Sequence, residues 1–225
     1  MRKIFILLML TFTFILIGIL TLFILRSALA TKNYKLKVGN LDRSYRLHLP
    51  KNYDKNKKYP LIVAFHGLGD SPWVLEINSG LSRKADKENF IIAYPKGTGR
   101  KLSWNAGFCC GYAFENRIDD VGFAKNLIEK LKKDFAVNKV FLVGFSNGGM
   151  FAYNLSSQIS DIDGVAVIAG TAGSNELTLP PPTSSIPLIA LHGRKDQVVP
   201  FDGGGEFNFL SVEESMKSWP EKNKN

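Results

Sequence analysis

The chain has 225 residues, of which 45% are hydrophobic and 22% are charged. This composition is typical of one folded domain and excludes an intrinsically disordered or collagen-like protein. The formal net charge is +9, from 29 Lys and Arg against 20 Asp and Glu, but the excess is scattered along the chain without a basic stripe. Nucleic-acid binding is therefore not expected.

The amino-terminal segment is strongly apolar. Residues 4–25 form a run of 22, of which 18 are hydrophobic, and Arg2 and Lys3 precede it. As a helix this run would be about 33 Å long, enough to cross a bilayer. Residues 28–30 read A-L-A, which signal peptidase could cleave, but most cleaved signals have a shorter apolar run. We therefore expect residues 1–30 to be a signal peptide or, preferably, an uncleaved transmembrane anchor, with residues 31–225 extracytoplasmic as a membrane-anchored or secreted domain.

The two cysteines, Cys109 and Cys110, are adjacent. Across a trans peptide their Cα atoms would lie about 3.8 Å apart, below the usual disulfide range of roughly 4.4–6.8 Å. A zinc site would need further ligands. We expect both cysteines to be free, or to lack their partner.

Strands and helices alternate in the predicted order after residue 30. Residues 34–38 and 44–49 alternate apolar and polar side chains, which indicates an antiparallel hairpin at a sheet edge. Continuous apolar runs predict buried strands at 59–65, 90–94, 139–143, 165–169 and 187–191. Helical periodicity is weak at 74–87 and clear at 119–135, and short helices are expected at 148–158 and 212–219. Three consecutive prolines place 177–187 in a loop, and the alternation as a whole predicts a mostly parallel α/β sheet with flanking helices.

Residues 144–148 read G-F-S-N-G, directly after one predicted strand and at the start of a predicted helix. In this context a G-x-S-x-G motif turns so tightly that the serine adopts strained dihedral angles and its neighbours must lack bulky side chains. Ser146 is therefore the candidate nucleophile. The backbone N–H of Asn147 would point to the same place, where the helix dipole favours an oxyanion. The alternative is a glycine-rich turn that contains a serine by chance.

Residues 66–70, H-G-L-G-D, follow the predicted strand 59–65. In folds with a G-x-S-x-G turn, a loop after a neighbouring strand supplies the second oxyanion N–H, which here would come from Gly67 or Leu68. We expect the His66 ring to hydrogen-bond the turn rather than to act as a base.

Residues 192–196, H-G-R-K-D, follow the predicted strand 187–191. The catalytic order serine, acid, histidine makes Asp196 the candidate acid, which would orient an imidazole. Asp202 is the alternative acid.

Several short segments together resemble one family of enzymes. They are Y-P at 94–95, W-N-A-G at 104–107, C-C-G at 109–111, D-D-V-G-F at 119–123, G-F-S-N-G-G-M at 144–150, and H-G at 192–193 with Asp196. Between about residues 34 and 219 the chain resembles the polyhydroxybutyrate depolymerase and feruloyl esterase family of secreted α/β-hydrolases. The resemblance implies a serine esterase that needs no metal or organic cofactor. It also places the W-N-A-G segment near the active-site mouth, and implies that Asp119 and Asp120 open a helix as structural residues.

The histidines depart from the family pattern. The catalytic histidine should follow Asp196, but the chain's histidines are His48, His66 and His192. The final strand and helix of the α/β-hydrolase fold are also expected to be missing, which would leave strand 187–191 with exposed apolar side chains. Two hypotheses remain. One is an exported esterase acting on polyester, on feruloyl or acetyl esters of polysaccharide, or on small esters. The other is a catalytically inactive truncated remnant or membrane-tethered binding protein.

Overall fold

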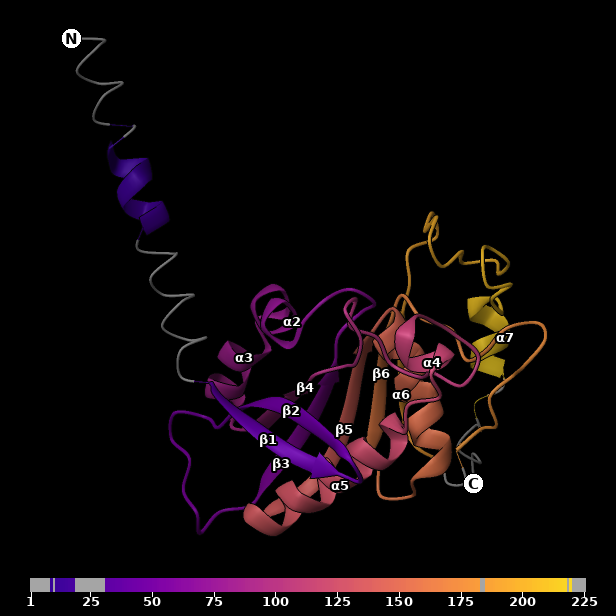
Figure 1. Ribbon diagram of the computed structural model, residues 1–225. Helices are drawn as coiled ribbons and strands as arrows, with labels where there is room; N and C mark the ends of the chain where they lie inside the picture. The colour runs from indigo at the N-terminus through magenta and orange to yellow at the C-terminus, as the bar shows by residue number, and fades with distance from the viewer. Residues whose placement is uncertain (1–8, 10, 19–30, 183–184, 218, 220–225) are drawn as a thin grey trace, which may run out of the picture.

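The computed structural model describes residues 9, 11–18, 31–182, 185–217 and 219 (Figure 1). Its centre is a seven-stranded sheet in the order β1-β2-β4-β3-β5-β6-β7. The strands are β1 (Lys32–Val38), β2 (Leu41–His48), β3 (Tyr59–Phe65), β4 (Ile91–Pro95), β5 (Val137–Phe145), β6 (Gly164–Ile168) and β7 (Leu188–Leu191). The helices are α2 (Pro72–Ser79), α3 (Leu81–Glu88), α4 (Tyr112–Glu115), α5 (Asp120–Asp134), α6 (Asn147–Gln158) and α7 (Val212–Lys217).

The expected hairpin and parallel sheet are both confirmed. β1 pairs antiparallel with β2, and β2 pairs antiparallel with β4. From β4 through β3, β5 and β6 to β7 every pairing is parallel. The carboxyl ends of these five strands therefore share one edge of the sheet, where ligands of such folds bind.

The central strands are covered by helices on both faces, which explains why their sequences are continuously apolar. In β3, Leu61, Val63 and Phe65 pack with α5 and α6 in the larger hydrophobic core. Ala64, which points to the opposite face, packs with Ala85 of α3 in a second, smaller core. β3 thus packs against helices on both faces of the sheet.

One helical prediction needs correction, and one short helix was missed. The segment 74–87 is not one helix but part of α2 and α3, which are separated at Gly80. Gly80 has φ of 63°, a left-handed conformation that ends α2 and that glycine adopts without a steric penalty. The four-residue helix α4 was not predicted, because one turn carries no detectable periodicity.

The prediction for the cysteines is wrong. Cys109 and Cys110 are joined by a disulfide, and the peptide between them is cis. The cis bond brings their Cα atoms to 3.1 Å. The expectation of free cysteines relied on the usual Cα separation of roughly 4.4–6.8 Å in disulfides, and this disulfide between adjacent residues lies outside that range.

Most of the predicted anchor, residues 4–25, lies outside the described residues. The part that is described, residue 9 and residues 11–18, is helical. Its apolar side chains are exposed, for example Phe12 at 65% and Phe14 at 73%. Within the described parts of the chain, no helix is both long and apolar enough to span a membrane.

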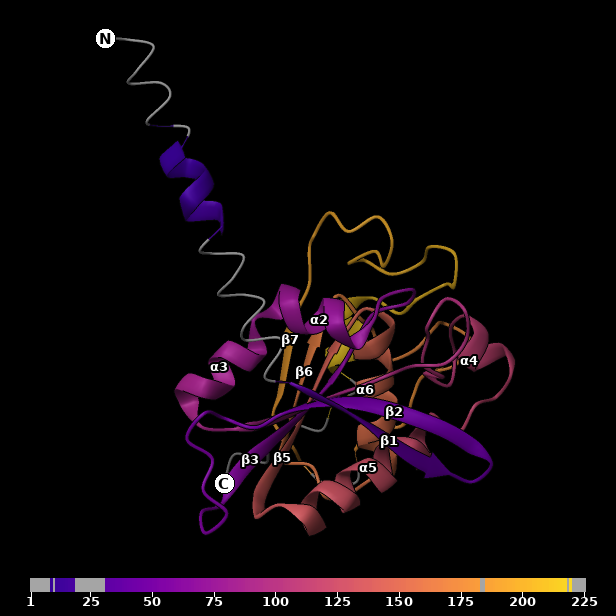
Figure 2. The ribbon, with the colours of Figure 1, turned by 60° about the vertical axis from the view of Figure 1, so that its left-hand side comes forward.

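β7 is the outer strand of the sheet beyond β6 (Figure 2). Ile189 and Leu191, which share one face of this strand, are 61% and 60% exposed. The prediction of exposed apolar side chains at this edge is confirmed for the described residues.

Candidate active site

Ser146 lies at the turn between β5 and α6, as the motif predicts. Its φ of 52° and ψ of −123° place a non-glycine residue in a strained region of backbone conformation. The turn is too tight for side chains at Gly144 and Gly148. A Cβ at Gly144 would lie 2.1 Å from the Gly148 carbonyl oxygen, and one at Gly148 would lie 2.4 Å from the Phe65 carbonyl oxygen. The two glycines therefore allow the chain to project Ser146 at the carboxyl edge of the sheet.

The side chain of Asn147 holds the neighbouring loop. Its Oδ1 accepts a hydrogen bond from the Trp104 N–H at 2.8 Å, and its Nδ2 donates to the Trp104 carbonyl at 3.0 Å. Nδ2 also lies 3.7 Å from Sγ of Cys110, in the disulfide. The W-N-A-G and C-C-G segments thus lie beside the nucleophile turn, as the resemblance implied.

The Gly67 turn lies against Ser146. A Cβ at Gly67 would lie 3.5 Å from the Ser146 Cβ. Among the described residues, the N–H of Leu68 has no hydrogen-bond partner, and the N–H of Asn147 begins a helix, where no intrahelical acceptor exists. The N–H groups of Leu68 and Asn147 are therefore free to donate to an oxyanion. The role of Gly67, Leu68 and Asn147 as oxyanion donors stays a prediction.

His66 is a structural residue, as expected. It is fully buried, its Nδ1 donates to the Gly67 carbonyl at 2.7 Å, and its Nε2 accepts from the Gly97 N–H at 3.0 Å. The two partners fix a neutral ring protonated at Nδ1. Burial lowers the pKa of His66 below its ordinary value of 6.5, against the raising effect of the Gly67 carbonyl. Both nitrogens are occupied, so His66 is not placed to take a proton from Ser146.

Asp196 lies in the loop after β7, at the same edge of the sheet as Ser146. Its Oδ1 accepts hydrogen bonds from the N–H groups of Val198 and Val199, each at 2.9 Å. Its Oδ2 lies 3.8 Å from Nε2 of His192. The alternative acid, Asp202, is exposed and makes no hydrogen bond or ion pair with a described residue. The geometry therefore favours Asp196 as the ordered carboxylate, although its catalytic role remains a prediction.

The other two histidines also have partners away from Ser146. His192 Nε2 donates to the Val199 carbonyl at 2.7 Å. His48, on β2, lies 3.0 Å from Asp86 through Nε2 and 3.2 Å from the Thr31 hydroxyl through Nδ1. No hydrogen bond joins a histidine to the Ser146 hydroxyl within the described residues.

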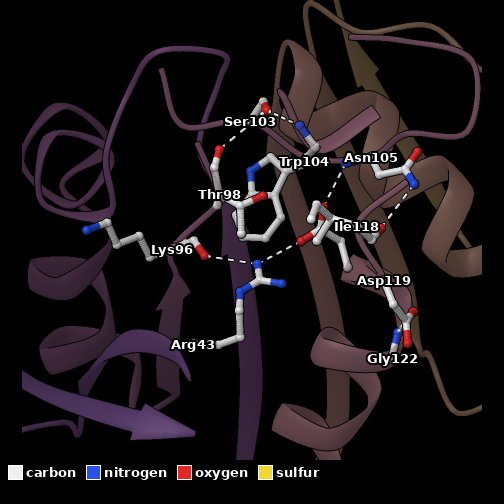
Figure 3. Close-up of polar contacts among 12 residues, drawn as sticks. Arg43, Lys96, Thr98, Ser103, Trp104, Asn105, Ile118, Asp119 and Gly122 are labelled. Carbon is white, nitrogen blue, oxygen red and sulfur yellow. Dashed lines mark hydrogen bonds and ion pairs between the residues drawn. The ribbon is translucent and has the colours of Figure 1, made fainter. Parts of the chain in front are cut away.

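A buried ion pair anchors the W-N-A-G loop to the sheet (Figure 3). Arg43 of β2 donates to Asp120 at 2.7 Å, and the other carboxylate oxygen of Asp120 accepts from the Asn105 N–H at 2.8 Å. The Arg43 guanidinium also lies 4.0 Å from the centre of the Phe123 ring. Burial raises the pKa of the Asp120 carboxyl, although the Arg43 charge opposes this shift.

Asp119 and Asp120 are thus structural, as the resemblance implied. Asp119 caps α5 by accepting from the Gly122 N–H at 2.7 Å, and Asp120 reaches Arg43, 77 residues away in sequence. Sequence reasoning did not find Arg43, because only the folded sheet brings it to the helix.

Apolar side chains flank the nucleophile. Leu68 is 45% exposed and Phe145 is 43% exposed. A Cβ at Gly67 would lie 3.0 Å from the Phe145 ring, which places that ring beside the Gly67 turn.

The sheet order, the serine turn and the flanking helices define an α/β-hydrolase. The family model described as phospholipase/carboxylesterase matches residues 52–211, and the chain belongs to this family. It is similar to a solved thermostable esterase with a TM-score of 0.56 and 17% identity, over 87% of this chain and 56% of that one. At this identity the likeness shows the fold alone.

Two relatives are esterases by name. One is the bifunctional acetylxylan esterase/xylanase XynS20E of Neocallimastix patriciarum, 27% identical over 83% of this chain and 25% of the relative. The other is feruloyl esterase B of Piromyces equi, 24% identical over 80% of this chain and 35% of the relative. The expected likeness to feruloyl esterases is confirmed. The chain spans only about a quarter to a third of the length of these two relatives.

Proposed function

We propose that this chain carries the nucleophile, oxyanion hole and acid of a carboxylic ester hydrolase. The observation that carries the proposal is the strained conformation of Ser146 beside the Gly67 turn. Ser146 Oγ would attack the ester carbonyl, and the N–H groups of Asn147 and of Gly67 or Leu68 would stabilise the oxyanion. The C–O bond to the alcohol would then break, with the alcohol leaving together with the serine proton, and water would release the acyl group from Ser146 as the carboxylic acid.

The proposal needs a general base beside Ser146. Serine is a weak nucleophile until an adjacent base accepts its proton, and the three histidines of the chain are bound elsewhere. Asp196 has one carboxylate oxygen fixed by its own loop and a second that could orient an imidazole. Turnover at an ordinary rate therefore requires an imidazole placed between Asp196 and Ser146.

The substrate class that we propose is an ester of a polysaccharide, with an acetyl or feruloyl acyl group. The relatives named for acetylxylan and feruloyl esters support it, and the apolar Leu68 and Phe145 beside Ser146 suit either acyl group. Hydrolysis of polyester or of small esters stays a prediction from the resemblance. Export, with residues 1–30 as anchor or signal, is part of the proposal because such polymers lie outside the cell.

The second candidate function is a binding protein without turnover. The observation that favours it is the engagement of all three histidines. Such a protein would bind the ester-bearing polymer but leave its ester bonds intact.

An active-serine phosphonate and chemical rescue by imidazole test the two candidates. We expect free imidazole to raise both the phosphonate labelling of Ser146 and the rate of aryl-ester hydrolysis, because it supplies the base that both reactions need. The Ser146→Ala variant is the matched control, since imidazole also hydrolyses aryl esters in solution. A chain that is not labelled, and that gains no more rate from imidazole than Ser146→Ala, is not an esterase.

A further inference from the structure

A groove of about 380 Å³ lies between the β1–β2 hairpin and the start of α2. Its volume falls in the range of ordinary ligand sites. Its lining includes Asn33, Lys35, Ser44, Arg46, Trp73 and Lys96. None of them belongs to the esterase site proposed above.

The strand register shows which side chains face the groove. Asn33 pairs with Arg46, and Lys35 pairs with Ser44, so these four side chains share one face of the hairpin. Arg46 identifies that face as the one toward α2, because it forms an ion pair of 2.7 Å with Glu76 of that helix. The hairpin thus presents an amide, a hydroxyl and the ammonium group of Lys35, which are groups that bind hydroxyls and carboxylates, while Arg46 is paired with Glu76.

Trp73 supplies an apolar surface beside these polar groups. It is in the first turn of α2, directly after Pro72, and is 49% exposed. An indole exposed at a polar groove offers a flat face to a ring with C–H groups, and an N–H to an acceptor. Sugar rings have both features.

Two lysines give the groove its charge. Lys35 and Lys96 are exposed, and neither forms a salt bridge within the described part of the chain. The Lys96 backbone is fixed, because its N–H donates to the Ser44 carbonyl at 2.9 Å and its carbonyl accepts from Arg43 at 3.2 Å. Its side chain extends away from the Arg43–Trp104 cluster (Figure 3). A ligand that carries carboxylates would complement these two ammonium groups.

The groove lies at the same edge of the sheet as Ser146. Lys96 directly follows β4, which is separated from β5 by β3 alone. Two strand spacings, about 10 Å, therefore separate Lys96 from Ser146 across the sheet, and the hairpin side of the groove lies beyond β4. A polymer could therefore occupy the groove while a more distant unit reaches the nucleophile.

We propose that this groove binds an acidic polysaccharide, through stacking of a sugar ring on Trp73 and contacts of uronate carboxylates with Lys35 and Lys96. The inference deepens the proposed function by naming uronate-bearing polymer as the substrate class. Binding itself requires no catalysis, so it can be tested separately from ester hydrolysis.

Affinity electrophoresis of the full chain in non-ionic detergent tests the proposal, with polygalacturonate or neutral arabinoxylan in the gel. We expect polygalacturonate to bind at least about fivefold more tightly, and added salt to weaken it. Trp73→Ala should weaken binding roughly threefold to tenfold, while Trp73→Phe retains most of it. Lys35→Gln and Lys96→Gln should each weaken it roughly twofold to fivefold.

Lys57→Gln is the matched control, because Lys57 is exposed in the turn before β3, at the opposite edge of the sheet. It should bind within about twofold of the parent chain. Ser146→Ala should also bind like the parent chain. Loss of polymer binding would therefore count against the groove proposal alone, and loss of ester hydrolysis against the esterase proposal alone.

Three results overturn the proposal: equal affinity for the neutral polymer, groove variants indistinguishable from Lys57→Gln, or absence of polygalacturonate binding. If soluble dihexanoyl phosphatidylglycerol instead binds with the expected variant pattern, the groove is a lipid-headgroup site.

Discussion

Replacing Asp120 by alanine removes one partner of the buried Arg43–Asp120 pair, and we expect a large loss of stability. Both side chains are almost fully inaccessible, at 3% for Arg43 and 0% for Asp120. The variant would leave the Arg43 guanidinium charged in the protein interior, and the Asn105 N–H without its acceptor. Breaking a buried pair in this way costs about 3–5 kcal/mol in the free energy of unfolding.

Urea denaturation followed by tryptophan fluorescence measures this loss, because Trp104 lies 6.0 Å from the Arg43 guanidinium. With an m-value of about 2.5 kcal/mol/M, a loss of about 4 kcal/mol lowers the urea midpoint by about 1.6 M. The neighbouring Asp119→Ala variant is the matched control. It removes only an exposed helix cap and should cost about 1 kcal/mol.

A double variant, Arg43→Met with Asp120→Leu, separates the cost of an unpaired charge from the cost of lost packing. Replacing both partners by apolar side chains of similar size removes the buried charge, so most of the stability should return. The reasoning is refuted if Asp120→Ala costs no more than Asp119→Ala. It is also refuted if the double variant is as unstable as Asp120→Ala.

The remaining predictions concern pH, the loop clamp and the sheet edge. Since burial lowers the pKa of His66, its contribution to stability is present above pH 6.5 and is lost as the pH falls below that value, and His66→Gln should flatten this part of a stability–pH profile. Asn147→Ala leaves the N–H and carbonyl of Trp104 unpaired and should cost about 2–4 kcal/mol in a urea titration, whereas a cost below about 1 kcal/mol would contradict the clamp. Changing Ile189 and Leu191 to lysine should reduce aggregation measured by light scattering, with a stability change within about 0.5 kcal/mol for each substitution, because both side chains are exposed on the edge strand.

Local patterns in the sequence predicted most of the fold. The buried strand at residues 59–65 was found with its observed bounds, because a strand between two helical layers needs apolar residues on both faces. The break at Gly80 was missed, because the weak helical periodicity of residues 74–87 did not show where one helix ends and the next begins. Its glycine was a usable signal, since a left-handed residue often ends a helix.

Long-range partners in the site were not predictable in the same way. The G-x-S-x-G motif gave the position and strain of Ser146, because the turn geometry is local. The partners of Asp120 and of the Asn147 side chain depend on strand register and loop path, which the sequence pattern does not specify. The disulfide was missed for a different reason, since a bridge between adjacent cysteines has a Cα separation of 3.1 Å, outside the usual range of roughly 4.4–6.8 Å.

The parts that shape the nucleophile and the parts that would activate it belong to different regions of the chain. His66, Trp104 and Asn147 are buried and hydrogen-bonded to one another's loops, so they hold the turn independently of any base. Asp196 lies in a separate loop after β7, with 21% of its side chain exposed. The final yield of phosphonate labelling at saturating imidazole therefore reports the shape of the site, while the dependence of the hydrolysis rate on imidazole reports its activation. High labelling with an imidazole-dependent rate identifies an intact site without a base, whereas low labelling at every imidazole concentration assigns the defect to the turn itself.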